Sequence, residues 1–214
     1  MSSREKQLPH DLALALTASR RWYESGGKDG QRLFLAYESY ENIDFSGELF
    51  TEATLQEANL GRSCLEAVNA VSALANGIHL NNSILHFSNW MKAEMEGADF
   101  SGAAGKQVKF MKAMLREAIF RESDFSESDF SQAVCIRTDF SRADLTGCNF
   151  TKALLDGANF EDTDLTNAIL NGSHISDDTK ISAARGIEKI QCTHIFFQNK
   201  RLDEGMAIDC LKNL

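Results

Sequence analysis

Proline is almost absent from this 214-residue chain, and its single proline, Pro9, lies near the N-terminus. Because proline cannot donate a backbone hydrogen bond, this absence suits a fold in which most N–H groups are bonded between strands. Long apolar runs are also lacking. The first one is interrupted by Asp11 and closed by Arg20 and Arg21, so we expect neither a membrane span nor an export signal.

Cysteine is scarce and has no pattern. The five cysteines form no CxxC pair, so neither a zinc site nor a complete disulfide framework is indicated, and we expect reduced thiols in a cytoplasmic protein. Basic residues are outnumbered, with 22 Lys and Arg against 31 Asp and Glu, a net charge of −9. This balance disfavours direct binding to nucleic acid or to an anionic membrane, and it predicts that a charged partner would be basic.

Motifs of catalysis and cofactor binding are missing as well. The sequence contains no GxxxxGK[ST], GxSxG or HExxH pattern, and its five histidines have no metal-ligand spacing. We therefore expect a protein that is not an enzyme and that uses no cofactor or metal.

A five-residue period is the dominant pattern that the sequence does contain. From Leu35 to Ile175 every fifth position can be read in one register, and 25 of these 29 positions are large and apolar. The residue two places earlier is small in 22 of the 25 cases between Ala53 and Ser173. A helix repeats at 3.6 residues and a strand at 2, so neither explains a period of five.

Four such units can form one square turn of 20 residues. The fifth-position side chains then point to the axis, with the small residues beside them, and turns stack at roughly 4.8 Å, so about seven turns are expected. Aromatic residues dominate two facing columns, which places Phe140 opposite Phe150 and over Phe160. Cys135 and Cys148 also fall in inward positions, where a thiol packs as a small apolar group.

Several of these units resemble those of a known family. "SRADL", "TGCNF", "DGANF" and "EDTDL" are similar to the A-(D/N)-(L/F)-x-x signature of the pentapeptide-repeat family. The resemblance covers about two thirds of the chain. It implies an all-β solenoid, a right-handed quadrilateral β-helix, in a family whose members have different functions.

The segments outside the repeat suggest helical caps. Residues 10–25 read as a helix stopped by Gly26 and Gly27, and residues 203–214 as a short helix that buries Met206, Ile208 and Leu211. We therefore divide the chain into three parts. These are an N-terminal helical cap at 1–30, the β-helix at 31–176 and a C-terminal cap at 177–214.

The repeat weakens between about residues 68 and 110. Ala70, Ala75 and Gly105 underfill the axis there, while Val68, Ile78 and Val108 overfill the small positions. Compensation within layers explains this pattern, and a bulge or kink with a recognition role is the alternative.

One outer side of the predicted rod is acidic. The proposed acidic face contains six carboxylates, with Lys106 alone opposing them: Asp44, Glu66, Asp124, Glu127, Asp144 and Asp164. Asn fills the same repeat position on other sides, for example at Asn149, and both residue types bond nearby backbone at turns. The acidity is therefore either a binding surface or a by-product of turn chemistry.

Two further sets face outward. Lys92, Lys109, Lys112 and Lys152 are expected to form a solvated basic side opposite the acidic one. A third side carries an apolar stripe, which consists of Leu74, Met114, Val134, Ile136 and Leu154. The C-terminal segment could fold back over this stripe, or a partner or a second copy of the chain could cover it.

Two functions are compatible with these features. The first is a rigid, non-enzymatic module that binds another protein through an outer face. The second follows from the family resemblance, because its antibiotic-resistance members imitate duplex DNA and occupy the basic DNA-binding saddle of a type II topoisomerase such as DNA gyrase. A rod of about seven turns is short for a mimic of DNA, and end-to-end homodimerisation through the C-terminal cap is the simplest way to lengthen it.

Overall fold

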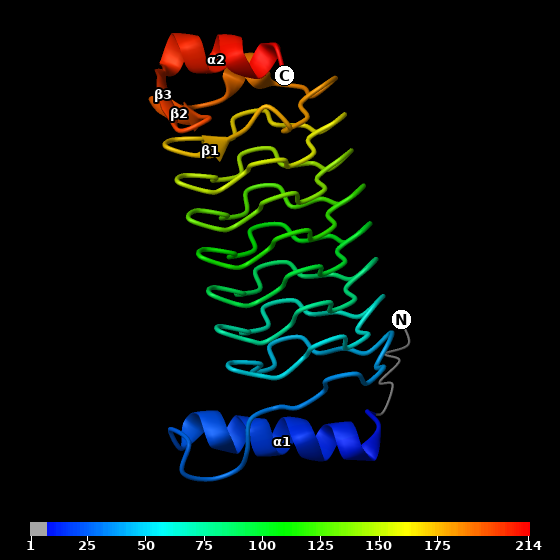
Figure 1. Cartoon of the computed structure of the whole chain (residues 1–214). Helices are drawn as coiled ribbons and strands as arrows, with labels where there is room; N and C mark the ends of the chain where they lie inside the picture. The colour runs from blue at the N-terminus through cyan, green and yellow to red at the C-terminus, as the bar shows by residue number, and fades with distance from the viewer. Residues whose placement is uncertain (1–7) are drawn as a thin grey trace.

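A computed structural model describes residues 8–214, which form a rod with a helix at each end (Figure 1). The helices and strands are α1 (His10–Glu24), β1 (His174–Ile175), η1 (Ile187–Lys189), β2 (His194–Phe197), β3 (Lys200–Asp203) and α2 (Glu204–Lys212). Between α1 and β1 the chain winds in stacked coils held by isolated bridges. No helix within the described residues is long and apolar enough to cross a membrane.

Parallel bridges join residues that are 20 positions apart, from Phe34 and Thr54 to Leu154 and His174. They run in four columns, one on each side of a coil, so the first and third columns lie on opposite sides of the rod. The backbone of each coil is therefore bonded to the coils before and after it. This arrangement is that of a solenoid, in which each repeat contacts only its neighbours.

One unit shows why the period is five. Phe140 points inward, Ser141 and Arg142 turn the corner, and the N–H of Ala143 donates to the carbonyl of Phe140 at 3.0 Å. Arg142 has φ 59°, the left-handed conformation that this corner requires. Three extended residues and two corner residues thus make one side of the square.

Aromatic rings fill the axis as the pattern predicts. The ring of Phe140 lies 5.8 Å from that of Phe150 in an edge contact and 5.1 Å from that of Phe160, with which it stacks at 10°. All three side chains are buried. The prediction that Phe140 faces Phe150 and stacks on Phe160 is confirmed.

The irregular stretch from 68 to 110 contains no bulge, and at Gly105 the compensation comes from the next coil and not, as expected, from within the layer. Its bridges keep the 20-residue spacing, for example between Asn69 and Asn89, so no bulge or kink interrupts the coils. Gly105 leaves space that the next coil fills, because a Cβ added there would lie 2.1 Å from Cε1 of Phe125. The missing side chain in one layer and the large ring in the next are two parts of one packing unit.

The N-terminal helix lies across the first coil. Leu12 and Leu16 are buried in the core that runs through the rod, and the Tyr40 hydroxyl donates to Asp11 at 3.0 Å. Gly26 and Gly27, which follow α1, both have positive φ, at 64° and 84°. The helix predicted over residues 10–25 is therefore found at His10–Glu24.

The last coil is longer than the others. Asn159 pairs with Lys180 and Ile169 with Gln191, which are spacings of 21 and 22 residues. β2 continues the ladder by pairing with β1, and it turns through Gln198 and Asn199, both left-handed, into antiparallel β3.

α2 then packs through a different face from the one expected. Ala207 and Leu211, four residues apart, are buried, whereas Met206 is 56% exposed. The prediction that Met206 is buried is wrong, because residues four apart share one helix face and that face carries Ala207 and Leu211.

Candidate interaction faces

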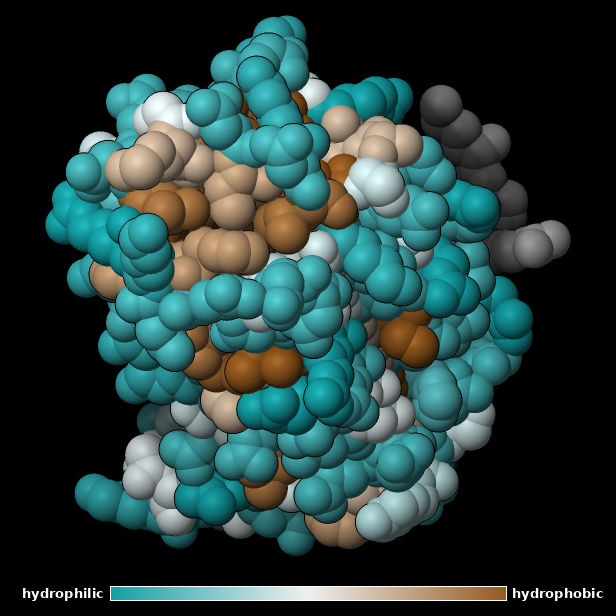
Figure 2. All heavy atoms as spheres, turned by 45° about the horizontal axis from the view of Figure 1, so that its top comes forward, coloured by the Kyte–Doolittle hydropathy of each residue, from teal (hydrophilic) through white to brown (hydrophobic). Residues whose placement is uncertain are grey.

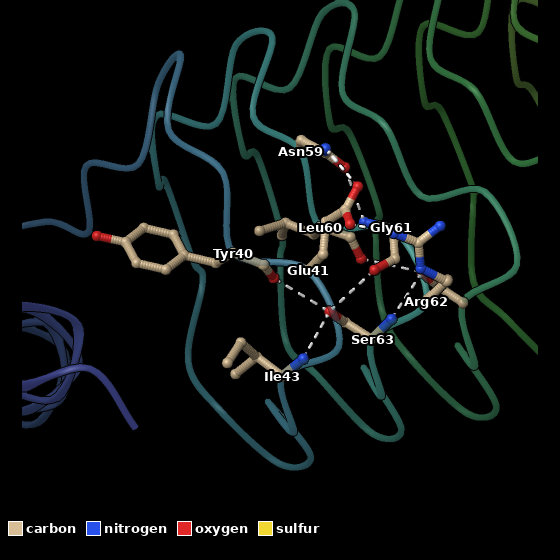
Figure 3. Close-up of polar contacts among 9 residues, drawn as sticks. Tyr40, Glu41, Ile43, Asn59, Leu60, Gly61, Arg62 and Ser63 are labelled. Carbon is tan, nitrogen blue, oxygen red and sulfur yellow. Dashed lines mark hydrogen bonds and ion pairs between the residues drawn. The ribbon is translucent and has the colours of Figure 1, made fainter. Parts of the chain in front are cut away.

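Small side chains hold neighbouring coils together at the corners. Figure 3 shows Ser63, whose hydroxyl accepts from the N–H of Ile43 at 3.0 Å and donates to the carbonyl of Tyr40 at 3.2 Å. On the same corner Glu41 accepts from Asn59 at 2.7 Å and pairs with Arg62. The polar groups at this corner therefore bond to one another within the protein.

Four of the six predicted acidic residues occupy one bridge column. Asp124, Asp144 and Asp164 are consecutive in this column. Asp44 belongs to the same column but is separated from them by Cys64, Ile84 and Ala104. Glu66 and Glu127 lie at the adjacent corner and are exposed. The structure therefore brings Asp124, Asp144 and Asp164 together on consecutive coils, and it leaves Asp44 and Glu66 apart from them.

These aspartates bond the backbone at their turns. Oδ1 of Asp124 accepts from the N–H of Ser126 at 3.0 Å, and Asp144 accepts from Thr146 at 2.9 Å. Asn149 makes the same bond to Thr151 at 3.0 Å on another side. The turn therefore needs an acceptor oxygen and does not need the charge.

The corner of the acidic column also carries cations. Lys106 pairs with Glu127 at 3.0 Å, and Arg185 of the lengthened coil pairs with Asp164 at 3.5 Å. Burial alone would raise the pKa of Asp164, but hydrogen bonds from Thr166 and the charge of Arg185 outweigh it and lower that pKa. Asp124 and Asp144 form no ion pair with any residue of 8–214.

The apolar stripe lies on the side opposite the acidic column. Leu74, Met114, Val134 and Leu154 share one column, in which Glu94 separates Leu74 from Met114. Leu74 and Met114 remain 37% and 40% exposed, so the C-terminal segment does not fold back over them. Figure 2, which looks partly onto the C-terminal end, shows apolar patches within a mostly hydrophilic surface.

The lysines are arranged differently from the prediction. Lys109 belongs to the column that lies between the acidic and the apolar ones. Lys92, Lys112 and Lys152 occupy left-handed corner positions between Lys109's side and the apolar stripe. The expected lysine side opposite the acidic column is wrong, because that position belongs to the apolar stripe.

Two exposed apolar residues and two buried thiols lie outside the sets described so far. Ile84 and Phe87, 43% and 54% exposed, lie near the middle of the acidic column and were not singled out from the sequence. Cys135 and Cys148 are buried, and burial raises the pKa of both thiols. No three His, Cys, Asp or Glu side chains converge as metal ligands within residues 8–214.

A family model for pentapeptide repeats matches residues 93–132, 109–147 and 133–172, with eight copies of the repeat. Residues 93–172 therefore consist of pentapeptide repeats. The repeats and the structural likeness reported below give the coils the fold of pentapeptide-repeat proteins, a right-handed quadrilateral β-helix. Among curated protein sequences none matches the chain significantly.

Solved structures of pentapeptide-repeat proteins resemble this one. Two trypsin-treated variants of QnrB1, a plasmid-mediated fluoroquinolone resistance protein, give TM-scores of 0.55 and 0.53 at 17% and 13% identity. These matches cover 73% and 78% of this chain and 81% and 84% of QnrB1. HetL, a protein of Nostoc sp. strain PCC 7120 involved in heterocyst differentiation regulation, gives a TM-score of 0.37 at 17% identity, with 86% and 97% of the two chains covered.

Proposed function

We propose that this protein is a rigid, non-enzymatic module that binds another protein through an outer face of its β-helix. The observation that carries the proposal is the pair Asp124 and Asp144, which are adjacent in one column and form no ion pair within residues 8–214. The axis of the rod is filled by buried side chains, so recognition has to use the surface.

The acidic column suits a basic partner. Two carboxylates about 4.8 Å apart repel each other by a little under ~1 kcal/mol in bulk-water dielectric. The turns could avoid this cost, because Asn makes the same backbone bond at position 149. Charge that the turn does not require therefore supports a binding role, in which it would speed encounter and select partners.

A second candidate function is binding to a type II topoisomerase such as DNA gyrase as a mimic of DNA. Two observations favour it: the acidic column, and the likeness in fold to QnrB1, which is a fluoroquinolone resistance protein. In this case the rod would double its length by homodimerisation through its C-terminal end. Binding to a bacterial topoisomerase would place the protein in the cytoplasm.

We further propose that α1 and α2 cap about seven coils, with boundaries near 1–30, 31–176 and 177–214, of which residues 1–7 lie outside the described chain. Support comes from burial at both ends, where Leu12 and Leu16 cover the first coil and Ala207 and Leu211 belong to the same core. A capped end hides backbone groups that could otherwise pair with another chain.

Removal of residues 203–214 should cause self-association. The truncation takes away Ala207 and Leu211 and exposes the apolar end of the rod that they cover. Light scattering at increasing protein concentration measures the result. As a control, Met206→Gln alters only an exposed side chain. The molar mass of its particles in solution should equal that of the wild type. A truncated chain of unchanged mass and melting temperature would contradict the capping role.

Asp124→Asn, Asp144→Asn and Asp164→Asn together should weaken binding to a basic partner and reduce its salt dependence, while the fold is retained. Asn keeps the turn acceptor and removes three charges. The matched control is Asp99→Asn, Asp129→Asn and Asp139→Asn, which removes three charges from equivalent turn positions on two other sides. Equal loss in both triple variants would show that net charge, and not this column, matters.

Supercoiling by a bacterial type II topoisomerase, with and without a quinolone, tests the second candidate function. Protection or inhibition by the wild type that is lost only in the acidic-column variant would support it. The absence of any effect at micromolar concentration would exclude the mimic for that enzyme. The general proposal would then be tested with basic partners of other kinds.

A further inference from the structure

A row of free lysines borders the apolar stripe. Lys92, Lys112 and Lys152, hereafter the lysine row, occupy equivalent corners with φ values of 59°, 60° and 58°. All three are exposed, and none forms an ion pair with a carboxylate in residues 8–214. The corner between Lys112 and Lys152 holds Gln132, so no acid interrupts the row.

Next to the lysine row the surface is apolar over consecutive coils. Met114, Val134 and Leu154 are paired in sequence along one column, which continues through His174 to Phe196. Met111, which precedes Lys112, is also partly exposed. Methionine is flexible and polarisable, and it is common on surfaces that bind apolar side chains. Glu94 marks the N-terminal limit of this continuous part.

The stripe ends in a hollow of about 460 Å³ near the C-terminal end of the rod. Its walls include Lys152, Leu154, His174, His194 and Phe196, and none of its lining residues is a carboxylate. The His174 ring stacks on Phe196, with 4.8 Å between centroids. At Gly172 a Cβ would lie 3.5 Å from both Nε2 of His194 and Cγ of Lys152, so glycine there keeps the hollow open.

We propose that this side of the rod binds an acidic amphipathic segment of a partner protein. Its apolar side chains would cover Met114, Val134 and Leu154, and one of them would enter the hollow. Its carboxylates would meet the lysine row. Unpaired cations beside a partly exposed apolar column fit this chemistry, because such a partner buries apolar area and neutralises charge in one contact.

The dimensions set the length of the segment. Five rungs from Met114 to Phe196 at about 4.8 Å each span roughly 19 Å, the length of about 13 helical residues. The surface lies opposite the acidic column, so the proposal does not depend on the function proposed for Asp124 and Asp144. Both can hold in one molecule, which would then join a basic partner to an acidic one.

The test uses a synthetic 14-residue amphipathic peptide of Leu, Ala and Glu with a terminal Trp, and a second peptide in which Lys replaces every Glu. Calorimetric titration of the full chain should show one site for the acidic peptide. Lys112→Gln with Lys152→Gln should weaken that site about fivefold, as expected for two exposed ion pairs. The matched control is Lys109→Gln with Lys180→Gln, which removes two exposed lysines from other sides and should leave the affinity unchanged.

A second pair of variants tests the apolar contact. Val134→Asn with Leu154→Asn should reduce binding of the acidic peptide by tenfold or more, and Asn is tolerated at the equivalent bridge positions Asn149 and Asn159. Circular dichroism confirms that the variants fold. Equal affinity of the two lysine double variants for the acidic peptide would overturn the proposal, and so would undiminished binding by the Asn double variant. So would self-association of the wild type that Leu154→Asn abolishes without any binding of the peptide, because a second copy would then be the occupant.

Discussion

Replacing Phe140 by alanine should lower the free energy of unfolding by about 3–5 kcal/mol, as for other fully buried rings. The ring contacts Phe120, Phe130, Phe150 and Phe160, with centroid distances between 5.1 and 5.8 Å. Its loss leaves a void that touches three successive layers. Because the coils above and below are fixed by their own backbone bonds, the void cannot close by collapse of the rod.

Urea denaturation followed by circular dichroism measures this effect. Phe34→Ala is the matched control, since Phe34 is 65% exposed and its removal leaves no internal void. That control should change stability by less than about 0.5 kcal/mol, the usual range for surface positions. Similar losses for the two variants would mean that Phe140 does not carry the packing of its layer.

Leucine in place of Gly105 should destabilise the protein by about 3 kcal/mol, at the upper end of overpacking effects. Even the first added carbon would lie 2.1 Å from Cε1 of Phe125, and that ring is held by Phe100, Phe110 and Phe120. Phe125→Ala alone should cost a comparable amount, about 3–5 kcal/mol, because it empties the same space.

The two changes together should restore stability to within about 1.5 kcal/mol of the wild type, because the pair Leu and Ala has nearly the volume of Gly and Phe. Leucine already fills this column at Leu85 and Leu145. A double-mutant cycle in urea provides the coupling energy. Additive losses in the double variant would refute the claim that the two residues form one packing unit.

The five-residue rule in the sequence was sufficient to predict the coil, since each position in it has one geometric role. Phe140 and Phe150 could be placed opposite each other because the period fixes which side of the square each residue occupies. Gly105 appeared irregular in a single layer. Its compensation by Phe125 needed the layer above, which the 20-residue grouping supplies but a linear scan does not.

The surface was harder to predict than the core. Arg185 reaches Asp164 only because the last coil contains one extra residue before this bridge, so counting in twenties would pair Asp164 with Ala184 instead. The exposed Met206 was misassigned because a short helix offers several apolar faces, and the fold decides which one is buried. Lys92 and its equivalents lie at corners, where the period alone does not say to which side a residue belongs.

The constant 20-residue spacing of the bridges has a consequence for changes in chain length. Adding 20 residues within the coils would lengthen the rod by one coil, and deleting 20 would shorten it by one. Every later residue would face the same direction as before. A change of five would preserve the inward pattern and rotate all later sides by a quarter turn. If the change fell between Asp124 and Asp144, a deletion of five would move Asp144 into the column of Asp99, and an insertion of five would move it into the column of Asp129. The direction of a surface residue can therefore change without any change in the interior.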